Sequence, residues 1–273
     1  MTEQIPSGPS SAPEARKDAD AGPAAPEISI VIPAFNERQR LPRTLEEIHP
    51  FLSGRFRNFE IIVVDDGSSD GTGDAVREFR ARHPEVRLLT QPVNLGKGAA
   101  VRRGCLEARG DFVLFMDADH ATPISSVNAF LAAWAEHHPL VVNGVRTYQV
   151  EESRFRRIVG LMGLLIAHLI VFRSSIIDSQ CGFKMFTREA VRRIFPYCRL
   201  NSCLFDVEIF YLMHKFGIPS RFVAVEWENK AGSRINIPGT VIGGPMEMIW
   251  IRLFDRFGGY AKPVDDGQQP WVR

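Results

Sequence analysis

The stretch D-F-V-L-F-M-D-A-D-H, from Asp111 to His120, decides the predicted fold. Its apolar run at 112–116 is typical of a strand that is buried on both faces of a parallel sheet. Asp117 and Asp119 follow at once, just beyond the carboxyl end of that strand, where open α/β sheets bind their ligands. Two carboxylates there can hold Mg²⁺ or Mn²⁺ against the diphosphate of a nucleotide. The alternative is that one aspartate only caps the helix that follows.

Strands and helices alternate on both sides of this stretch. We expect strands at 27–33, 59–65, 86–90, 112–116, 140–145 and 221–226, and a loop entering a strand at 178–186. Helices are expected at 39–52, 73–82, up to about 109, at 124–137, 151–174, 188–195, 205–216 and 242–257. This alternation predicts an α/β fold, a single Rossmann-like domain with a mostly parallel central sheet whose loops converge on one rim.

Composition sets further limits. The chain has 273 residues and a net charge of +1, which gives no reason to expect nucleic-acid binding. Its four cysteines form no CxxC pair, and reduced thiols are the simpler interpretation. Residues 1–26 are predicted to be a disordered tail, 27–235 the catalytic domain, 236–260 a C-terminal amphipathic helix and 261–273 a second tail. No segment has the ~18 consecutive apolar residues of a membrane span.

Two familiar nucleotide-binding motifs are absent. Gly71-Thr72-Gly73 lacks the third glycine of a dinucleotide fingerprint, and the segment around Lys97 lacks the glycine and hydroxyl residue of a P-loop. The sequence therefore supports neither a dinucleotide-dependent dehydrogenase nor a P-loop phosphotransferase.

Five motifs occur in a fixed order between residues 27 and 235. They are I-P-A-F-N-E (32–37), V-V-D-D-G-S-S-D-G-T (63–72), N-L-G-K-G-A-A-V-R-R-G (94–104), D-A-D (117–119) and D-S-Q-C-G-F-K-M-F (178–186). Together they resemble the family 2 glycosyltransferases of GT-A fold, in particular dolichyl-phosphate β-glucosyltransferases and dolichol-phosphate mannose synthases. The Q-C-G-F-K motif resembles the glucosyltransferases more than the mannose synthases.

The resemblance implies roles for individual residues. The nucleotide-sugar donor would be bound by Pro33, Phe35, Glu37, Val64, Asp66, Lys97, Asp117, Ala118 and Asp119. Asp117 and Asp119 would hold the metal and take part in catalysis, and Asp178 would act as base or acceptor-orienting carboxylate. Arg146 and Arg234 would bind phosphate, although relatives often carry lysine at the second position. Asp206 and Glu208 compete with Asp178 for the acceptor role, but their spacing on a helix points them to different faces.

The expected reaction is an inverting transfer of a hexose from a nucleotide-sugar, with UDP-glucose and a polyprenyl (dolichyl-type) phosphate as the favoured pair. Such an enzyme must reach a lipid acceptor. The apolar run 158–172 is flanked by arginines, and the C-terminal helix carries Trp250 beside Arg252 and Arg256. These features predict peripheral contact with the cytoplasmic face of a membrane, or else domain core or a homodimer interface. The open alternatives are GDP-mannose as donor, a soluble or protein acceptor, a nucleotidyltransferase, and a non-catalytic membrane adaptor.

Overall fold

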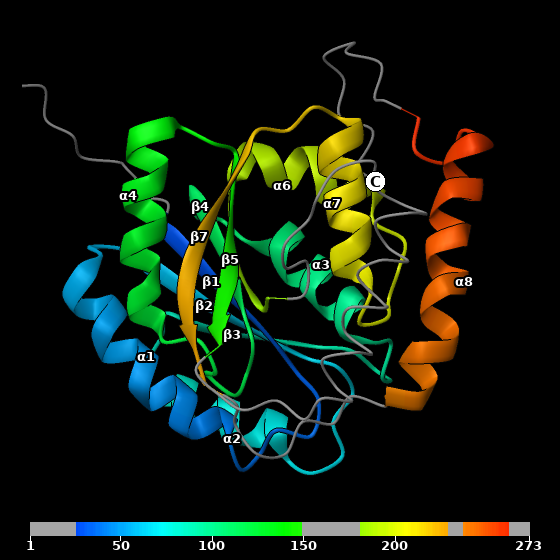
Figure 1. Cartoon of the computed structure of the whole chain (residues 1–273). Coiled ribbons are helices and arrows are strands. Elements are labelled where there is room, and N and C mark those ends of the chain that lie inside the picture. The colour runs from blue at the N-terminus through cyan, green and yellow to red at the C-terminus, as the bar shows by residue number, and fades with distance from the viewer. Residues whose placement is uncertain (1–25, 149–180, 229–236, 262–273) are drawn as a thin grey trace, which may run out of the picture.

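A seven-stranded sheet forms the centre of the molecule in the computed structural model, which describes residues 26–148, 181–228 and 237–261 (Figure 1). Its strands lie in the order β3-β2-β1-β4-β6-β5-β7. They are β1 (Ile28–Ala34), β2 (Phe59–Asp65), β3 (Val86–Thr90), β4 (Phe112–Met116), β5 (Val141–Tyr148), β6 (Phe183–Thr187) and β7 (Ser220–Trp227).

Strand β6 is the exception in an otherwise parallel sheet. It pairs antiparallel with both β4 and β5, whereas β1, β2, β3 and β4 are mutually parallel and β5 is parallel to β7. The predicted mostly parallel α/β sheet is confirmed. The reversal of β6 brings the start of this strand beside the end of β4, since Met116 lies opposite Phe183.

Helices cover both faces of the sheet (Figure 1). The first face packs against α1 (Leu41–Arg55), α2 (Thr72–Arg82), η1 (Ile124–Ser126) and α4 (Val127–His137). The second packs against α3 (Lys97–Glu107), α6 (Arg188–Ile194), η2 (Phe195–Tyr197) and α7 (Phe205–Lys215). A last helix, α8 (Ile237–Arg256), lies outside α7. Each face thus has its own buried apolar cluster, as expected for strands that are apolar on both sides.

Most observed boundaries lie within three residues of the predicted ones, and two differences are larger or change the type of helix. The helix expected at 124–137 begins with the 3-10 turn η1, and α8 begins five residues before the expected 242. The helix expected at 151–174 falls outside the described residues. Within the described residues, no helix is long and apolar enough to cross a membrane. All four cysteines are free, in agreement with the expected reduced thiols.

Candidate active site

Polar loops that follow β1, β2, β3 and β4 meet at one rim of the sheet. Side-chain hydroxyls of the loop after β2 tie it to the loop after β1. Ser68 Oγ accepts from the Asn36 backbone N–H (2.9 Å), and Thr72 Oγ1 accepts from the Glu37 N–H (2.8 Å). Because the four strands are parallel, residues far apart in sequence converge here.

The two aspartates of the D-A-D motif lie at this rim, directly after β4. Asp117 Oδ1 is 2.7 Å from Lys97 Nζ, and the intervening Ala118 carbonyl accepts from Thr44 Oγ1 of α1 (2.7 Å). Among the described residues, Asp119 Oδ1 accepts the nearby Ala121 N–H (3.1 Å). That bond forms a local turn and caps neither η1 nor α4, neither of which has a side-chain cap. The capping alternative therefore does not account for the pair.

Gly182 lies close to the Asp117 side chain. A Cβ atom placed on Gly182 would lie 2.0 Å from Asp117 Oδ2, closer than any non-bonded contact allows. This approach follows from the antiparallel pairing of β4 with β6, which sets Gly182 beside the end of β4. The glycine of the Q-C-G-F-K motif thus leaves room for the Asp117 carboxylate.

Lys97 provides the positive charge of the rim. Burial alone would lower the pKa of its ammonium group, but the carboxylates of Asp117 and Asp206 outweigh burial and raise it. Lys97 therefore stays protonated, and its Nζ also lies 5.4 Å from the centroid of the Phe115 ring. In this structure the lysine neutralises a carboxylate that is predicted to bind a metal.

Glu37 is already paired. Its carboxylate accepts from Nε and Nη2 of Arg40, at 2.7 and 2.5 Å. The hydrogen bond that Arg40 donates to Glu37 raises the pKa of Arg40, burial opposes the shift, and the charges of Glu37 and Asp119 add to it. Glu37, Arg40 and Asp119 are therefore electrostatic neighbours, as the convergence of the motifs predicts.

The buried Asp66 carboxylate organises the loop after β3. It accepts from Gln91 Nε2 (2.6 Å) and from the backbone N–H groups of Leu95 (2.8 Å) and Gly96 (2.9 Å). A carboxylate has about four acceptor positions, so roughly one remains for a ligand. Asp66 thus fixes the segment that carries Lys97, a function that the sequence did not reveal.

His120 contributes hydrogen bonds at this rim. Its Nε2 accepts from the Ile124 N–H (3.0 Å), which places the ring proton on Nδ1, 2.8 Å from Glu47 Oε2. Both ring nitrogens of His120 are thus occupied by contacts within the protein.

A buried ion pair lies behind the rim. Lys184 of β6 is fully buried, and its Nζ is 2.8 Å from Oδ1 of the buried Asp206 at the start of α7. The pKa of Asp206 is raised, because the effect of burial exceeds the opposing effects of the Lys184 charge and, less strongly, of the Lys97 charge. Sequence reasoning overlooked Lys184, although a lysine inside the apolar strand F-K-M-F is itself a signal.

Glu208 has a structural function. Its buried carboxylate accepts from the backbone N–H groups of Arg199 (2.9 Å) and Leu200 (2.8 Å) and from the hydroxyl of the buried Tyr260. Asp206 and Glu208 therefore point to different partners, as their spacing predicts. Glu208 holds α7, the preceding loop and the chain after α8 together. Its carboxylate is occupied by these contacts and is therefore poorly suited to orient the sugar acceptor.

The remaining predicted residues are distributed as follows. Val64 and Pro33 are buried, while Phe35 is 38% exposed. Arg146 of β5 is half-buried, and its guanidinium lies 5.4 Å from the Trp227 ring centroid. Asp178 and Arg234 lie outside the described residues, and their roles stay predictions.

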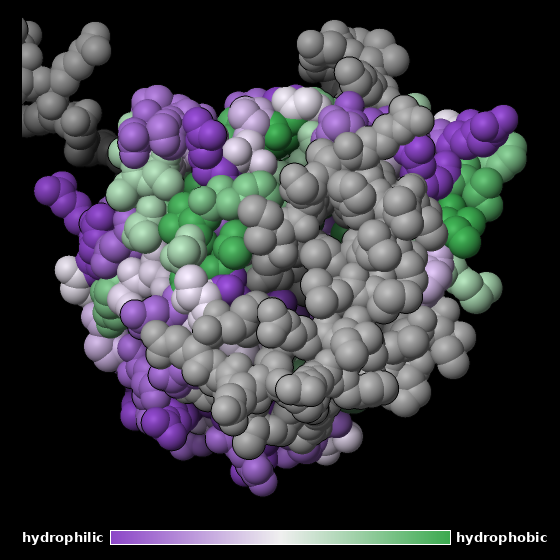
Figure 2. Space-filling view, viewed as in Figure 1, coloured by the Kyte–Doolittle hydropathy of each residue, from purple (hydrophilic) through white to green (hydrophobic). Residues whose placement is uncertain are grey.

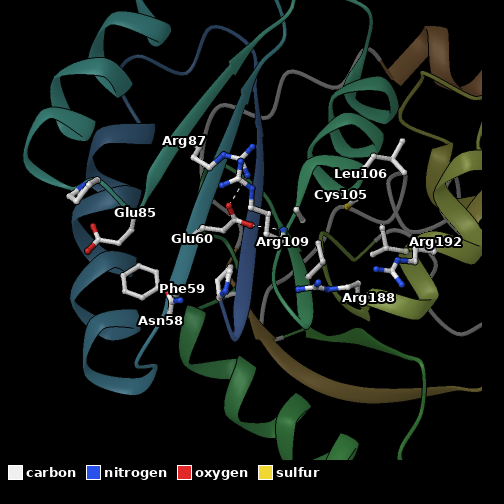
Figure 3. A pocket seen from close by; sticks show the side chains of 15 residues that line it. Asn58, Phe59, Glu60, Glu85, Arg87, Cys105, Leu106, Arg109, Arg188 and Arg192 are labelled. Atoms are coloured by element: carbon white, nitrogen blue, oxygen red, sulfur yellow. Dashed lines mark hydrogen bonds and ion pairs between the residues drawn. The ribbon is translucent and has the colours of Figure 1, made fainter. Parts of the chain in front are cut away.

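A cavity of about 880 Å³ lies at the opposite rim of the sheet. Figure 3 shows it among Glu60, Arg87, Arg109, Arg188 and Arg192, with Glu85 on the side away from Arg188 and Arg192. Glu60 is tied to Arg87 by a 2.7 Å ion pair. This cavity borders the amino ends of β2, β3 and β4, so it is separate from the D-A-D rim.

Comparison with known proteins gives consistent results. A family model described as glycosyl transferase family 2 matches residues 29–195. A dolichyl-phosphate β-glucosyltransferase of Trichomonas vaginalis is 37% identical, over 84% of this chain and 74% of its own length. The human protein of the same name is 34% identical, over 83% of this chain and 75% of its own length.

A solved structure shares the fold. Glucosyl-3-phosphoglycerate synthase from Mycobacterium tuberculosis superimposes with a TM-score of 0.61 at 23% identity, covering 85% of this chain and 80% of that protein. A second structure of that synthase, which holds Mn²⁺, UDP-glucose and phosphoglyceric acid, superimposes with a TM-score of 0.60 at 22% identity, with the same coverage. The GT-A type fold implied by the motifs is confirmed.

Proposed function

Because the chain belongs to glycosyl transferase family 2, we propose that it transfers glucose from UDP-glucose to a polyprenyl phosphate of the dolichyl type, with inversion at the anomeric carbon. The observation that carries this proposal is the rim where Lys97, Asp117 and Asp119 come together. The names of the relatives, dolichyl-phosphate β-glucosyltransferases at 34–37% identity, support the choice of donor sugar and acceptor.

The carboxylate pair suits a divalent ion. Asp117 and Asp119 offer hard oxygen ligands of the kind that Mg²⁺ and Mn²⁺ prefer, and Asp117 already binds a cation, the ammonium of Lys97. A bound ion would stabilise the charge that develops on the departing diphosphate. Lys97 would then contribute a second positive charge to the same leaving group.

The acceptor needs cations more than it needs a base. The second pKa of a phosphate monoester is about 6, so a lipid monophosphate is mostly ionised at neutral pH and is already nucleophilic. Arg146 and Arg234 would hold it by charge-assisted hydrogen bonds. Asp178 would orient the acceptor phosphate.

A product assay tests this function directly. The full-length protein is incubated with UDP-glucose, a short polyprenyl monophosphate and Mn²⁺, and the product is identified by mass. We expect glucosyl polyprenyl phosphate and UDP, and neither in excess EDTA, because the leaving group loses its stabilising charge. Full activity in EDTA would contradict the metal requirement. If only GDP-mannose yields a glycosylated lipid, the proposal of UDP-glucose as donor is wrong. If sugar is transferred only to a soluble acceptor, the proposal of a lipid acceptor is wrong. Release of pyrophosphate would indicate a nucleotidyltransferase.

We further propose that α8 binds the membrane surface. One side of α8 packs inward through Met248 and Ile251, and its Asp255 pairs with Lys215 and Tyr211 of α7. The opposite side exposes a large apolar stripe, which Figure 2 shows along the outer edge of the helix: Met246 (69% exposed), Ile249 (47%), Trp250 (38%), Leu253 (50%) and Phe257 (83%). Arg252 and Arg256 of α8 are exposed, although the Arg252 guanidinium also lies 5.9 Å from the Tyr211 ring centroid of α7, while Glu247 and Asp255 of α8 bind residues of the domain; this charge distribution suits an anionic lipid surface.

Leu253→Glu combined with Phe257→Glu should weaken binding to vesicles that contain anionic phospholipid by at least ~10-fold, because two side chains that enter the lipid become charged. Co-sedimentation measures the effect. Leu106→Glu changes a similarly exposed apolar residue (49%) of α3 and should leave binding unchanged. If the wild-type protein does not bind vesicles and forms a dimer, and the double variant is monomeric, the stripe is a homodimer interface instead.

A further inference from the structure

Two histidines and a glutamate meet at the outer edge of the sheet, away from the D-A-D rim. His49 belongs to α1, His83 directly follows α2, and Glu85 precedes β3. One ligand atom from each residue lies within 4.8 Å of the other two, and all three residues are half-buried. Figure 3 shows Glu85 together with Phe59 at the amino ends of β2 and β3.

The separation of these atoms suits a shared ion better than a direct bond. His49 Nε2 and Glu85 Oε2 are 3.5 Å apart, at the outer limit for a hydrogen bond. Ligands that bind one tetrahedral Zn²⁺ at about 2.0–2.1 Å lie roughly 3.3 Å from each other. Small rotations of the side chains would therefore bring all three atoms to one ion.

Aromatic packing holds the two imidazoles in place. The rings of His49 and His83 lie 4.1 Å apart, centroid to centroid, at 51°. The edge of Phe59 contacts His49 (5.5 Å), and the ring of Phe79 stacks on His83 (4.3 Å). These contacts restrict both imidazoles to a small range of orientations, so binding an ion after small rotations would cost less conformational freedom.

We propose that His49, His83 and Glu85 form a binding site for a transition-metal ion of the Zn²⁺ type. Imidazole nitrogens favour Zn²⁺ and its neighbours, whereas the all-oxygen pair at the D-A-D rim favours Mg²⁺ or Mn²⁺. Water would take the fourth position of a tetrahedral site. The ion would join α1, the end of α2 and the start of β3, and so stabilise this edge of the sheet without entering the transfer reaction.

Cobalt titration provides the test, since tetrahedral Co²⁺ ligated by nitrogen absorbs visible light far more strongly than octahedral Co²⁺ on oxygen. Full-length protein without a histidine tag is stripped of metal and titrated with Co²⁺, then with Zn²⁺ as competitor. We expect one tetrahedral site per chain and a rise in melting temperature with Zn²⁺. His83→Ala should raise the dissociation constant by at least ~10-fold and remove that thermal shift. The exposed His214 of α7 provides the matched control, His214→Ala, which should bind as the wild type does.

Glu85→Gln provides a second variant if His83→Ala does not fold, because Glu85 lies nearer the surface, with a 37% exposed side chain. It should likewise weaken Co²⁺ binding. The proposal is overturned if wild-type protein shows no tetrahedral band, or if His83→Ala or a folded Glu85→Gln binds Co²⁺ as tightly as wild type. In that case His49 and Glu85 form only an ion pair.

Discussion

Lys184→Met is expected to destabilise the protein by about 3–5 kcal/mol, as breaking a buried ion pair does. The substitution removes the ammonium that lies 2.8 Å from Asp206 and leaves that carboxylate buried without its main partner. Burial already raises the pKa of Asp206, so loss of Lys184 raises it further. Urea unfolding followed by circular dichroism measures the change in unfolding free energy.

Two controls separate this ion pair from an ordinary loss of charge. Arg43→Met breaks the exposed pair of Arg43 with Glu47, whose side chains are 82% and 36% exposed, and should change stability little. The double variant Lys184→Met with Asp206→Leu removes both charges and should recover most of the loss, because no unpaired charge is left. If Lys184→Met alone is as stable as the wild type, the buried pair has been wrongly described.

Asp119→Ala is expected to lower kcat by at least ~10³-fold, because the developing charge on the diphosphate loses a metal ligand. The fold should persist, since Asp119 is partly exposed and the hydrogen bond that it accepts from the Ala121 N–H is local. Steady-state UDP release gives kcat, and circular dichroism checks the fold.

Asp111→Ala is the matched control, since Asp111 precedes the same strand at its other end and its side chain is 75% exposed. This variant should retain wild-type kcat. An Asp119→Ala enzyme that keeps more than a tenth of wild-type kcat would exclude Asp119 from the metal site.

The rim was predictable because its residues follow apolar strands. Asp66, Lys97 and Asp117 each stand just after a strand or at the start of a helix, and parallel strands bring such positions together whatever their distance in sequence. The hydrogen-bond partners of these side chains were less predictable. The sequence does not show that Asp66 already accepts three hydrogen bonds.

Other features depend on the direction of strands and on which helix face packs inward. A reversed strand leaves the same apolar pattern as a parallel one, so the sequence concealed the contact of Gly182 with Asp117. The apolar stripe of α8 was found from its spacing, yet periodicity cannot tell a stripe that faces solvent from one that faces the core. The first and last members of the triad, His49 and Glu85, are 36 positions apart in the sequence, and no short motif marks the group.

Calorimetric titration of UDP into the protein, with and without Mn²⁺, tests the central claim most directly. The rim predicts that Mn²⁺ tightens UDP binding by at least ~10-fold in wild type, and that Asp119→Ala loses this gain while keeping its fold. Equal UDP affinity with and without Mn²⁺, or a gain that survives in Asp119→Ala, would contradict the account.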